Sequence, residues 1–125
     1  MRQIKFRGKR IDNDEWMTGM HTLVQDADGT WLGDAEKTEK VNPNTLGQFT
    51  GLLDKNGKEI YEGDILHTVT FGFEPEEYTA IILYDNCRFQ LSNGRNLFYF
   101  GQTDFTKMDD TIVIGNIHDN PELIN

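Results

Sequence analysis

Short runs rich in Ile, Val, Thr, Tyr and Phe alternate with turn-forming pairs along the whole chain. No long window shows the 3.6-residue period of an amphipathic helix. Strand-sized apolar runs separated by frequent turn signals are typical of an all-β protein. The pattern predicts strands at residues 3–7, 15–24, 49–53, 65–71, 78–84, 88–91, 96–100 and 111–117.

Asn-Gly and Asp-Gly pairs mark the places where neighbouring strands reverse direction. These pairs adopt a positive φ at little cost, which is what tight hairpins need. We therefore expect hairpins centred near three pairs: Asp28-Gly29, Asn56-Gly57 and Asn93-Gly94.

Little helix is expected. Residues 34–40 include good helix formers but lack an apolar face, so we interpret them as a solvated loop with at most one helical turn. Pro121 stands at a helix-start position and predicts a short turn at residues 120–124.

The length of 125 residues suits one domain. We predict a single continuous domain over residues 1–125, with subregions of about 1–55 and 56–125 that meet at a seam near residues 54–59. Residues 60–117 would form about five strands, enough for a small SH3-like barrel. Gly63 allows a tight turn there, the Asp64 carboxylate accepts nearby amide hydrogens, and Ile65 enters the core.

The charge balance bears on partners and location. The chain carries 21 acidic and 12 basic residues, a net charge of −9, which disfavours contact with phosphate backbones. No apolar run approaches the about 20 residues that span a bilayer, and no apolar stretch follows the basic start as a signal peptide requires. We therefore expect a soluble cytoplasmic protein with no membrane partner.

The basic residues gather at the start of the chain, where the first ten residues contain no acid. In a strand, Lys5, Arg7 and Lys9 would share one face, opposite Ile4 and Phe6. This face is either a small partner-binding stripe or, as we favour, the solvated face of an edge strand.

An aromatic cluster suggests a second candidate surface. Phe98, Tyr99 and Phe100 cannot all point to one face of a strand, so at least one ring points away from the core of its sheet. A second protein layer is the favoured neighbour, followed by another subunit. The possible partner surface thus comprises Lys5, Arg7, Lys9, Phe98, Tyr99 and Phe100.

Two segments look like calcium loops and fail on register. If Gly57 is the sixth residue of an EF-hand loop, Leu52 takes the first position and Gly63 the twelfth, where carboxylates are required. If Gly29 is sixth, Val24 is first. We interpret both segments as hairpin turns.

The other side chains with reactive or metal-binding chemistry form no motif. His21, His67 and His118 lack metal-ligand spacing, and Cys87 is the only cysteine. Ser92 lies in a turn and not in a nucleophile elbow. We predict no catalytic residues, no metal site and no cofactor.

Four segments together resemble the YopX family of phage and prophage proteins: residues 4–7, 47–65, 113–117 and 120–123. The long central segment is the most specific. The motif positions that we take as structural are Thr50, Gly51, Asn56, Gly57, Gly63, Asp64, Gly115 and Asn116. The resemblance implies a mostly β fold of bent, coiled antiparallel sheets, an origin in a bacterial virus or integrated element, and action in the bacterial cytoplasm. It implies no catalytic residue, cofactor or substrate.

The leading functional hypothesis is a small non-enzymatic accessory protein that binds a host or phage protein and self-associates. One alternative is nucleic-acid association through the basic N-terminal strand. Another is an acidic DNA mimic that blocks a host protein. A hydrolase or metal-dependent enzyme using Asp54, Asp64 or His118 is disfavoured because no motif supports it.

Overall fold

The computed structural model describes residues 4–34, 36–69, 76–85, 88–92 and 111–124. This part of the chain is all-β, with three antiparallel sheets and two short 3₁₀ turns, which confirms the predicted fold class. It divides into two compact units, Met1–Phe49 and Thr50–Asn125. The boundary precedes the seam expected near residues 54–59, and the single-domain reading stays a prediction.

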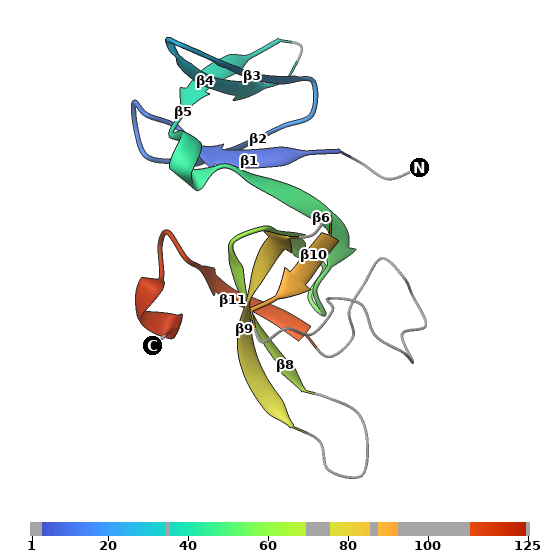
Figure 1. Cartoon of the computed structure of the whole chain (residues 1–125). Coiled ribbons are helices and arrows are strands. Elements are labelled where there is room, and N and C mark those ends of the chain that lie inside the picture. Colours follow the sequence, from blue (N-terminus) through green and yellow to red (C-terminus); the bar gives the residue numbers. More distant parts are fainter. Residues whose placement is uncertain (1–3, 35, 70–75, 86–87, 93–110, 125) are drawn as a thin grey trace. The chain divides into compact units, whose positions relative to one another are not determined.

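Unit 1 contains a three-stranded sheet and a hairpin, and the hairpin is part of the four-stranded sheet of order β2-β1-β6-β7 (Figure 1). In the hairpin, β1 (Phe6–Lys9) pairs with β2 (Trp16–Gly19). The sheet has the order β3-β4-β5 and consists of β3 (Thr22–Asp26), β4 (Gly29–Gly33) and β5 (Thr38–Val41). A 3₁₀ turn, η1 (Pro43–Thr45), leads into β6 (Gly47–Leu53), whose first two residues pair with β1.

The hairpin and the sheet of unit 1 approach each other closely. A Cβ atom added at Gly19 would lie 2.6 Å from the backbone nitrogen of Gly33, so no larger residue fits at this crossing without moving the backbone. Leu32 and Val41, from β4 and β5, are fully buried, and the Val41 side chain lies against Gly8 of β1. Because Gly19 and Gly33 let the hairpin and the three-stranded sheet come close together, a few apolar side chains are enough to fill the core of unit 1.

The single strand predicted at residues 15–24 is wrong, because the chain breaks at Met20 and His21. The N–H of Met20 donates to Asp34 Oδ1 at 3.1 Å, and the N–H of His21 donates to the carbonyl of Gly33 at 3.3 Å. These bonds to the end of β4 carry the chain from the hairpin into the three-stranded sheet.

The loop predicted at residues 34–40 is wrong for residues 38–40, which belong to β5. Asp34 and Lys37 close a tight turn in which each N–H donates to the carbonyl of the other, at 2.9 and 3.3 Å. This turn returns the chain onto β4, and the strand forms although Glu39 and Lys40 have little strand propensity.

Unit 2 contains the remainder of β6 and five further strands, followed by a terminal 3₁₀ turn. These are β7 (Glu59–Tyr61), β8 (Asp64–Val69), β9 (Glu77–Asp85), β10 (Arg88–Leu91), β11 (Thr111–Asn116) and η2 (Pro121–Ile124). A four-stranded sheet has the order β10-β9-β8-β11 (Figure 1). Because β10 and β11 do not pair among the described residues, the suggested SH3-like barrel is not closed.

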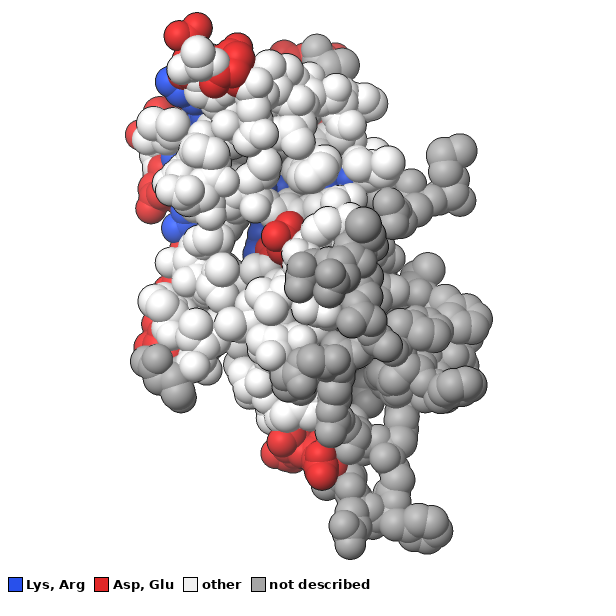
Figure 2. Space-filling model, viewed as in Figure 1, with Lys and Arg blue, Asp and Glu red and all other residues white. Residues whose placement is uncertain are grey.

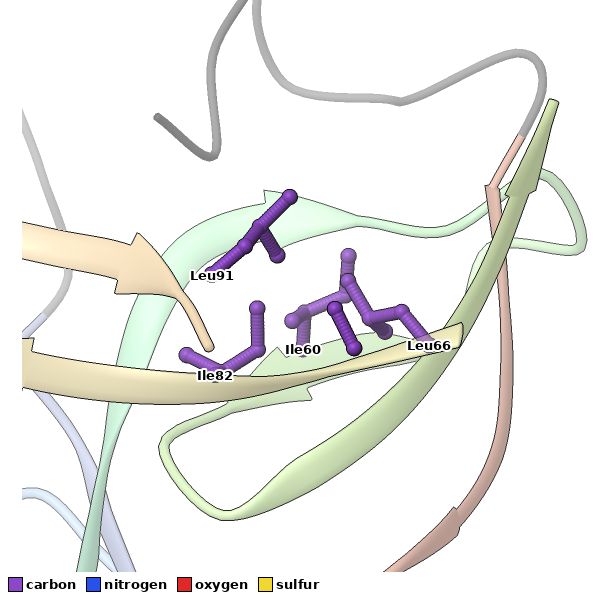
Figure 3. Packing of buried hydrophobic residues seen from close by; sticks show 5 residues of the cluster. Ile60, Leu66, Ile82 and Leu91 are labelled. Atoms are coloured by element: carbon purple, nitrogen blue, oxygen red, sulfur yellow. The ribbon is translucent and has the colours of Figure 1, made fainter. Parts of the chain in front are cut away.

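The core of unit 2 is a compact aliphatic cluster (Figure 3). Its members are Ile60, Leu66, Ala80, Ile82 and Leu91, each at most 4% exposed. Leu66 lies opposite Ala80 and Ile82 lies opposite Leu91 in the strand registers. Each large member contributes roughly 1.5–3 kcal/mol by leaving water.

Several local predictions are confirmed. Hairpin turns occur at Asp28-Gly29 and Asn56-Gly57, and η2 is the expected terminal turn. The strands expected at 49–53, 78–84, 88–91 and 111–117 are β6, β9, β10 and β11. The Asn93-Gly94 hairpin and the strand at 96–100 lie outside the described residues. In the described part of the chain, no helix is long and apolar enough to cross a membrane.

Candidate functional site

The basic residues of the N-terminal strand share one face, as predicted. The favoured interpretation as the solvated face of an edge strand is wrong, because β1 lies between β2 and β6 in its sheet. This face also carries aromatic rings. Lys5 Nζ lies 5.2 Å from the centroid of the Phe49 ring. The Arg7 guanidinium carbon lies 4.6 Å from the Trp16 ring centroid, and Lys9 Nζ lies 5.5 Å from the same ring. These are cation–π distances, so the cations stabilise the aromatic face of the hairpin.

Acidic side chains pair with the cations at the end of β1. Lys9 Nζ lies 3.6 Å from Asp14 Oδ2. Arg10 donates two hydrogen bonds to the Asp12 carboxylate, at 3.0 and 2.6 Å, and lies 3.5 Å from Glu39 Oε2. The hydrogen bond from Arg10 lowers the pKa of Asp12, and the same bond raises the pKa of Arg10.

The surface of unit 1 reflects this pairing. Figure 2 shows its blue atoms next to red ones along the left edge of the view, and no broad basic patch on the face that is drawn. The basic residues at the end of β1 are thus partly neutralised by their own neighbours. Contacts of this kind leave less positive potential for a phosphate backbone.

The Asp54 carboxylate organises the Asn56-Gly57 turn. Asp54 is 1% exposed. Its Oδ1 accepts hydrogen bonds from the N–H groups of Asn56 and Lys58, at 2.8 and 2.9 Å. Its Oδ2 accepts a hydrogen bond from the N–H of Val113 at 3.0 Å. Gly57 has φ of +83°, the left-handed conformation that the turn needs. The segment is a hairpin turn, as the register argument against calcium predicted.

Thr50 and Gly51 lie in β6, at the start of the family motif. The Thr50 hydroxyl donates to the carbonyl of Ile60 at 2.8 Å and accepts from the N–H of Leu52 at 3.2 Å. Gly51 has φ of +88°. Thr50 therefore ties β6 to β7 through a buried side chain, which is a structural role.

The Gly63-Asp64 turn has the geometry that the sequence predicts. Gly63 has φ of +91°, the Asp64 carboxylate accepts from the N–H of Tyr61 at 2.7 Å, and Ile65 is fully buried. The Gly63 N–H donates to the carbonyl of Ile82, and the Ile117 N–H donates to the carbonyl of Gly63, both at 2.9 Å. The turn thus connects β8 to β9 and to the end of β11.

Gly115 and Asn116 form the last part of the motif. The Asn116 side-chain oxygen accepts from the N–H groups of His118 and Asp119, at 3.0 and 2.9 Å. Asn120 Oδ1 accepts from the N–H of Asn116 at 3.2 Å and would lie 2.5 Å from a Cβ at Gly115. These residues shape the turn after β11.

Sequence reasoning missed one buried polar pair. The hydroxyls of Thr68, in β8, and Thr111, in β11, share a short hydrogen bond, and Thr111 is fully buried. The two residues are directly opposite in the register. Only strand pairing reveals the contact, because Thr is an ordinary strand residue in any sequence.

Of the three residues proposed for an enzymatic site, Asp54 and Asp64 lie in different turns. His118 lies beside the second of these turns, with its Nε2 3.8 Å from the position of a Cβ added at Gly63. The Asp54 and Asp64 carboxylates accept hydrogen bonds from different backbone segments. His21 is exposed, and His67 Nε2 lies 3.9 Å from Glu77 Oε2 at the surface. In the described part of the chain, no three His, Cys, Asp or Glu side chains are grouped as metal ligands. Cys87 lies outside it.

Two hollows that are lined by described residues alone are open to solvent, one in each unit. The hollow of unit 1, about 460 Å³, is lined by Met20, His21, Asp34, Glu36 and Lys37. The hollow of unit 2, about 210 Å³, is lined by Thr79, Ala80, Ile81, Ser92, Leu123 and Ile124. Neither contains Asp54, Asp64 or His118, so neither unites the residues of the enzymatic hypothesis.

Exposed apolar side chains gather on β3 of unit 1, which the sequence did not single out. Leu23 is 38% exposed and Val24 is 46% exposed, and neighbouring Met20 is 46% exposed. Adjacent residues of a strand point to opposite faces, so both faces of β3 carry apolar surface. The adjacent pair Leu23-Val24 was the available signal. Phe98, Tyr99 and Phe100 lie outside the described residues.

Comparisons with known proteins place the chain in one family. A family model described as YopX protein matches residues 5–125. The chain is similar to protein EF1440 from Enterococcus faecalis, a crystal structure with 28% sequence identity and a TM-score of 0.62. That similarity covers 100% of both chains. No curated protein matches the sequence, and the family's description names no enzymatic activity.

Proposed function

We propose that this chain, which belongs to the YopX family, is a non-enzymatic module that binds protein, including a further copy of itself. In this proposal it is an accessory protein of a phage or prophage and acts in the bacterial cytoplasm. The observation that carries the proposal is the exposed apolar strand β3, with Leu23 and Val24 on opposite faces. An accessible sheet edge adds a partner strand through main-chain hydrogen bonds, and contacts of alternate side chains make the addition specific.

The hydrogen bonds of the buried Asp54 and Asp64 carboxylates to backbone N–H groups also favour a binding role over an enzymatic one. A general base must reach a substrate proton. Asp54 instead has its two oxygens occupied by three backbone N–H groups, and Asp64 caps the turn that precedes β8. Both side chains are 1% exposed. Their arrangement stabilises turns and offers no accessible acid or base.

The nucleic-acid alternative has less support. It requires phosphate contacts from five cations: Arg2, Lys5, Arg7, Lys9 and Arg10. Lys5, Arg7 and Lys9 lie over the Phe49 and Trp16 rings, and Arg10 is paired with Asp12. Arg2 lies outside the described residues. The chain's net charge of −9 adds long-range repulsion. The DNA-mimic alternative requires free carboxylates at phosphate-like spacing, whereas Asp14 is paired with Lys9 and Asp12 with Arg10.

The solution mass of the full chain tests the proposal. We expect the mass measured by sedimentation to rise above that of one 14.4 kDa chain as the concentration increases. Small strand-mediated contacts give weak, concentration-dependent association, so the series runs from about 10 µM to about 1 mM. A single mass of one chain throughout, with no protein retained by the immobilised chain from a bacterial lysate, would refute the proposal.

A further inference from the structure

We infer that two copies of this chain pair through β3, antiparallel and about a two-fold axis at Val24, so that their three-stranded sheets become one. The inference rests on the proposed function, because it specifies the surface and register of self-association. It concerns unit 1 alone. Its basis is the topology of the β3-β4-β5 sheet.

The two edges of this sheet differ. The outer edge of β5 is bonded to the residues around the end of β1: the Ile11 N–H donates to the carbonyl of Lys40 at 3.1 Å, and the Asn42 N–H donates to the carbonyl of Lys9 at 2.8 Å. At the other edge, none of the strands in the described ranges pairs with β3 on the side away from β4. Strand β3 is therefore the edge that remains available.

Strand β3 lacks the features that normally protect an edge. Its register with β4 runs without a bulge from Thr22 opposite Gly33 to Asp26 opposite Gly29. Its sequence, Thr-Leu-Val-Gln-Asp, contains no Lys, Arg or Pro. Natural edge strands usually carry such residues or bulges, because a regular apolar edge recruits another strand. This edge is thus suited to strand addition.

The charge distribution favours a second copy in antiparallel orientation. Asp26 is the only charged residue of β3 and stands at its end. Antiparallel pairing places it opposite Thr22 of the second copy, whereas parallel in-register pairing would set two Asp26 carboxylates side by side. Like charges directly opposite each other are destabilising. The antiparallel pair also brings His21 opposite the turn between Asp26 and Asp28 of the second copy.

The register follows from the length of the strand. Val24 is the middle of the five residues of β3, so a two-fold axis there lets all five pair. Val24 also lies opposite Trp31 in β4, and Lys40 Nζ lies 5.6 Å from that ring. On one face of the joined sheet, Trp31 and Val24 of one copy would therefore continue into Val24 and Trp31 of the second copy. The four side chains would form one apolar row across the dimer. Aromatic and β-branched neighbours of this kind stabilise cross-strand pairs.

Cysteine cross-linking tests the register. Each variant carries Cys87→Ser, so that only the introduced thiol reacts, and is oxidised at a concentration where association is measured. Val24→Cys should form a disulfide dimer, because directly opposite residues have Cα atoms about 4.5–5.5 Å apart, within disulfide range. Leu23→Cys and Gln25→Cys are matched controls on the same strand. In a homodimer of either control variant, the thiols of the two copies are offset by two residues along the strands. Their Cα atoms lie about 8 Å apart, which is beyond disulfide range.

A mixture of the Leu23→Cys and Gln25→Cys variants should form the mixed disulfide in excess over either homodimer, because these positions face each other across the axis. Equal cross-linking of all three single variants, or none by Val24→Cys, would overturn the inference. If the uncross-linked chain still exceeds the mass of one copy, only the β3 register is wrong and the proposed self-association survives. A chain that stays at the mass of one copy would refute self-association and the inference together.

Discussion

The carboxylate of Asp54 and the backbone N–H of Val113 are joined by a hydrogen bond of 3.0 Å, although 59 residues separate them in the chain. The same carboxylate accepts the N–H groups of Asn56 and Lys58 within its own turn. A hairpin that forms locally is thereby fixed to the last strand of unit 2. This contact gives a structural reason for the burial of Asp54 in the motif.

Asp54→Ala should destabilise unit 2 by about 3 kcal/mol, because three N–H groups at a buried position lose their acceptor. Asp54→Asn keeps one oxygen as an acceptor and should cost less. Lys55→Ala, at the neighbouring exposed position, is the control and should leave stability nearly unchanged. Urea unfolding followed by circular dichroism measures the three. Equal midpoints for Asp54→Ala and the unmodified chain would contradict this role.

The pair of Arg10 and Asp12 predicts a small pH effect. Arg10 lowers the pKa of Asp12, chiefly through its hydrogen bond. A lowered carboxyl pKa contributes stability that is present above the unfolded value, about 3.9, and is lost as the pH falls through the folded pKa. Both groups are at the surface, where solvent screens the pair, so the effect on stability is slight.

The direct measurement for this pair is a carbon-detected NMR titration of the Asp12 carboxyl. Its midpoint should lie below that of an ordinary Asp and should rise in the Arg10→Gln variant. Added salt should raise the midpoint in the unmodified chain. Identical midpoints with and without the Arg10 guanidinium would show that the pair has no influence.

Adjacent residues of β9 should respond very differently to truncation. Ile82 is fully buried in the aliphatic cluster of unit 2, so Ile82→Ala should cost about 2–5 kcal/mol. Leu83 is 38% exposed, and Leu83→Ala should cost less than about 1 kcal/mol. The comparison uses urea unfolding of both variants. Similar losses would mean that the cluster is not the core.

The stacked basic strand predicts no binding to DNA. Arg7 and Lys9 lie over the Trp16 ring, and Lys9 also pairs with Asp14. We expect no retarded band with single- or double-stranded DNA at about 50 mM salt, where charge-driven binding is strong. A complex that weakens steeply with salt and disappears in a Lys5→Gln, Lys9→Gln double variant would restore the nucleic-acid alternative.

The local turns were readable from the sequence because their chemistry is local. Asn56-Gly57 and Gly63-Asp64 fix backbone conformations within a few residues, and the structure has both turns where expected. β10 has the predicted bounds, since its alternating polar and apolar residues are followed by turn-forming residues in the sequence. In the family motif, the side chains of Thr50, Asp54 and Asn116 form hydrogen bonds with backbone groups.

What the sequence did not reveal depends on contacts across the chain. The break at Met20 forms because Asp34, fourteen residues later, accepts its N–H. Lys40 and Glu39 are strand residues only because β4 lies beside them. The edge of β3 is likewise available because the residues around the end of β1 bond to β5 and not to β3. No window of sequence shows which strand ends a sheet.

The most direct test of self-association through β3 is sedimentation equilibrium on two lysine variants. Val24→Lys would set two ammonium groups opposite each other on the axis, whereas Leu83→Lys adds the same charge at another exposed apolar position of a strand. We predict that Val24→Lys stays at the mass of one chain over the whole concentration range while Leu83→Lys associates like the unmodified protein. Equal association of both variants would contradict the account.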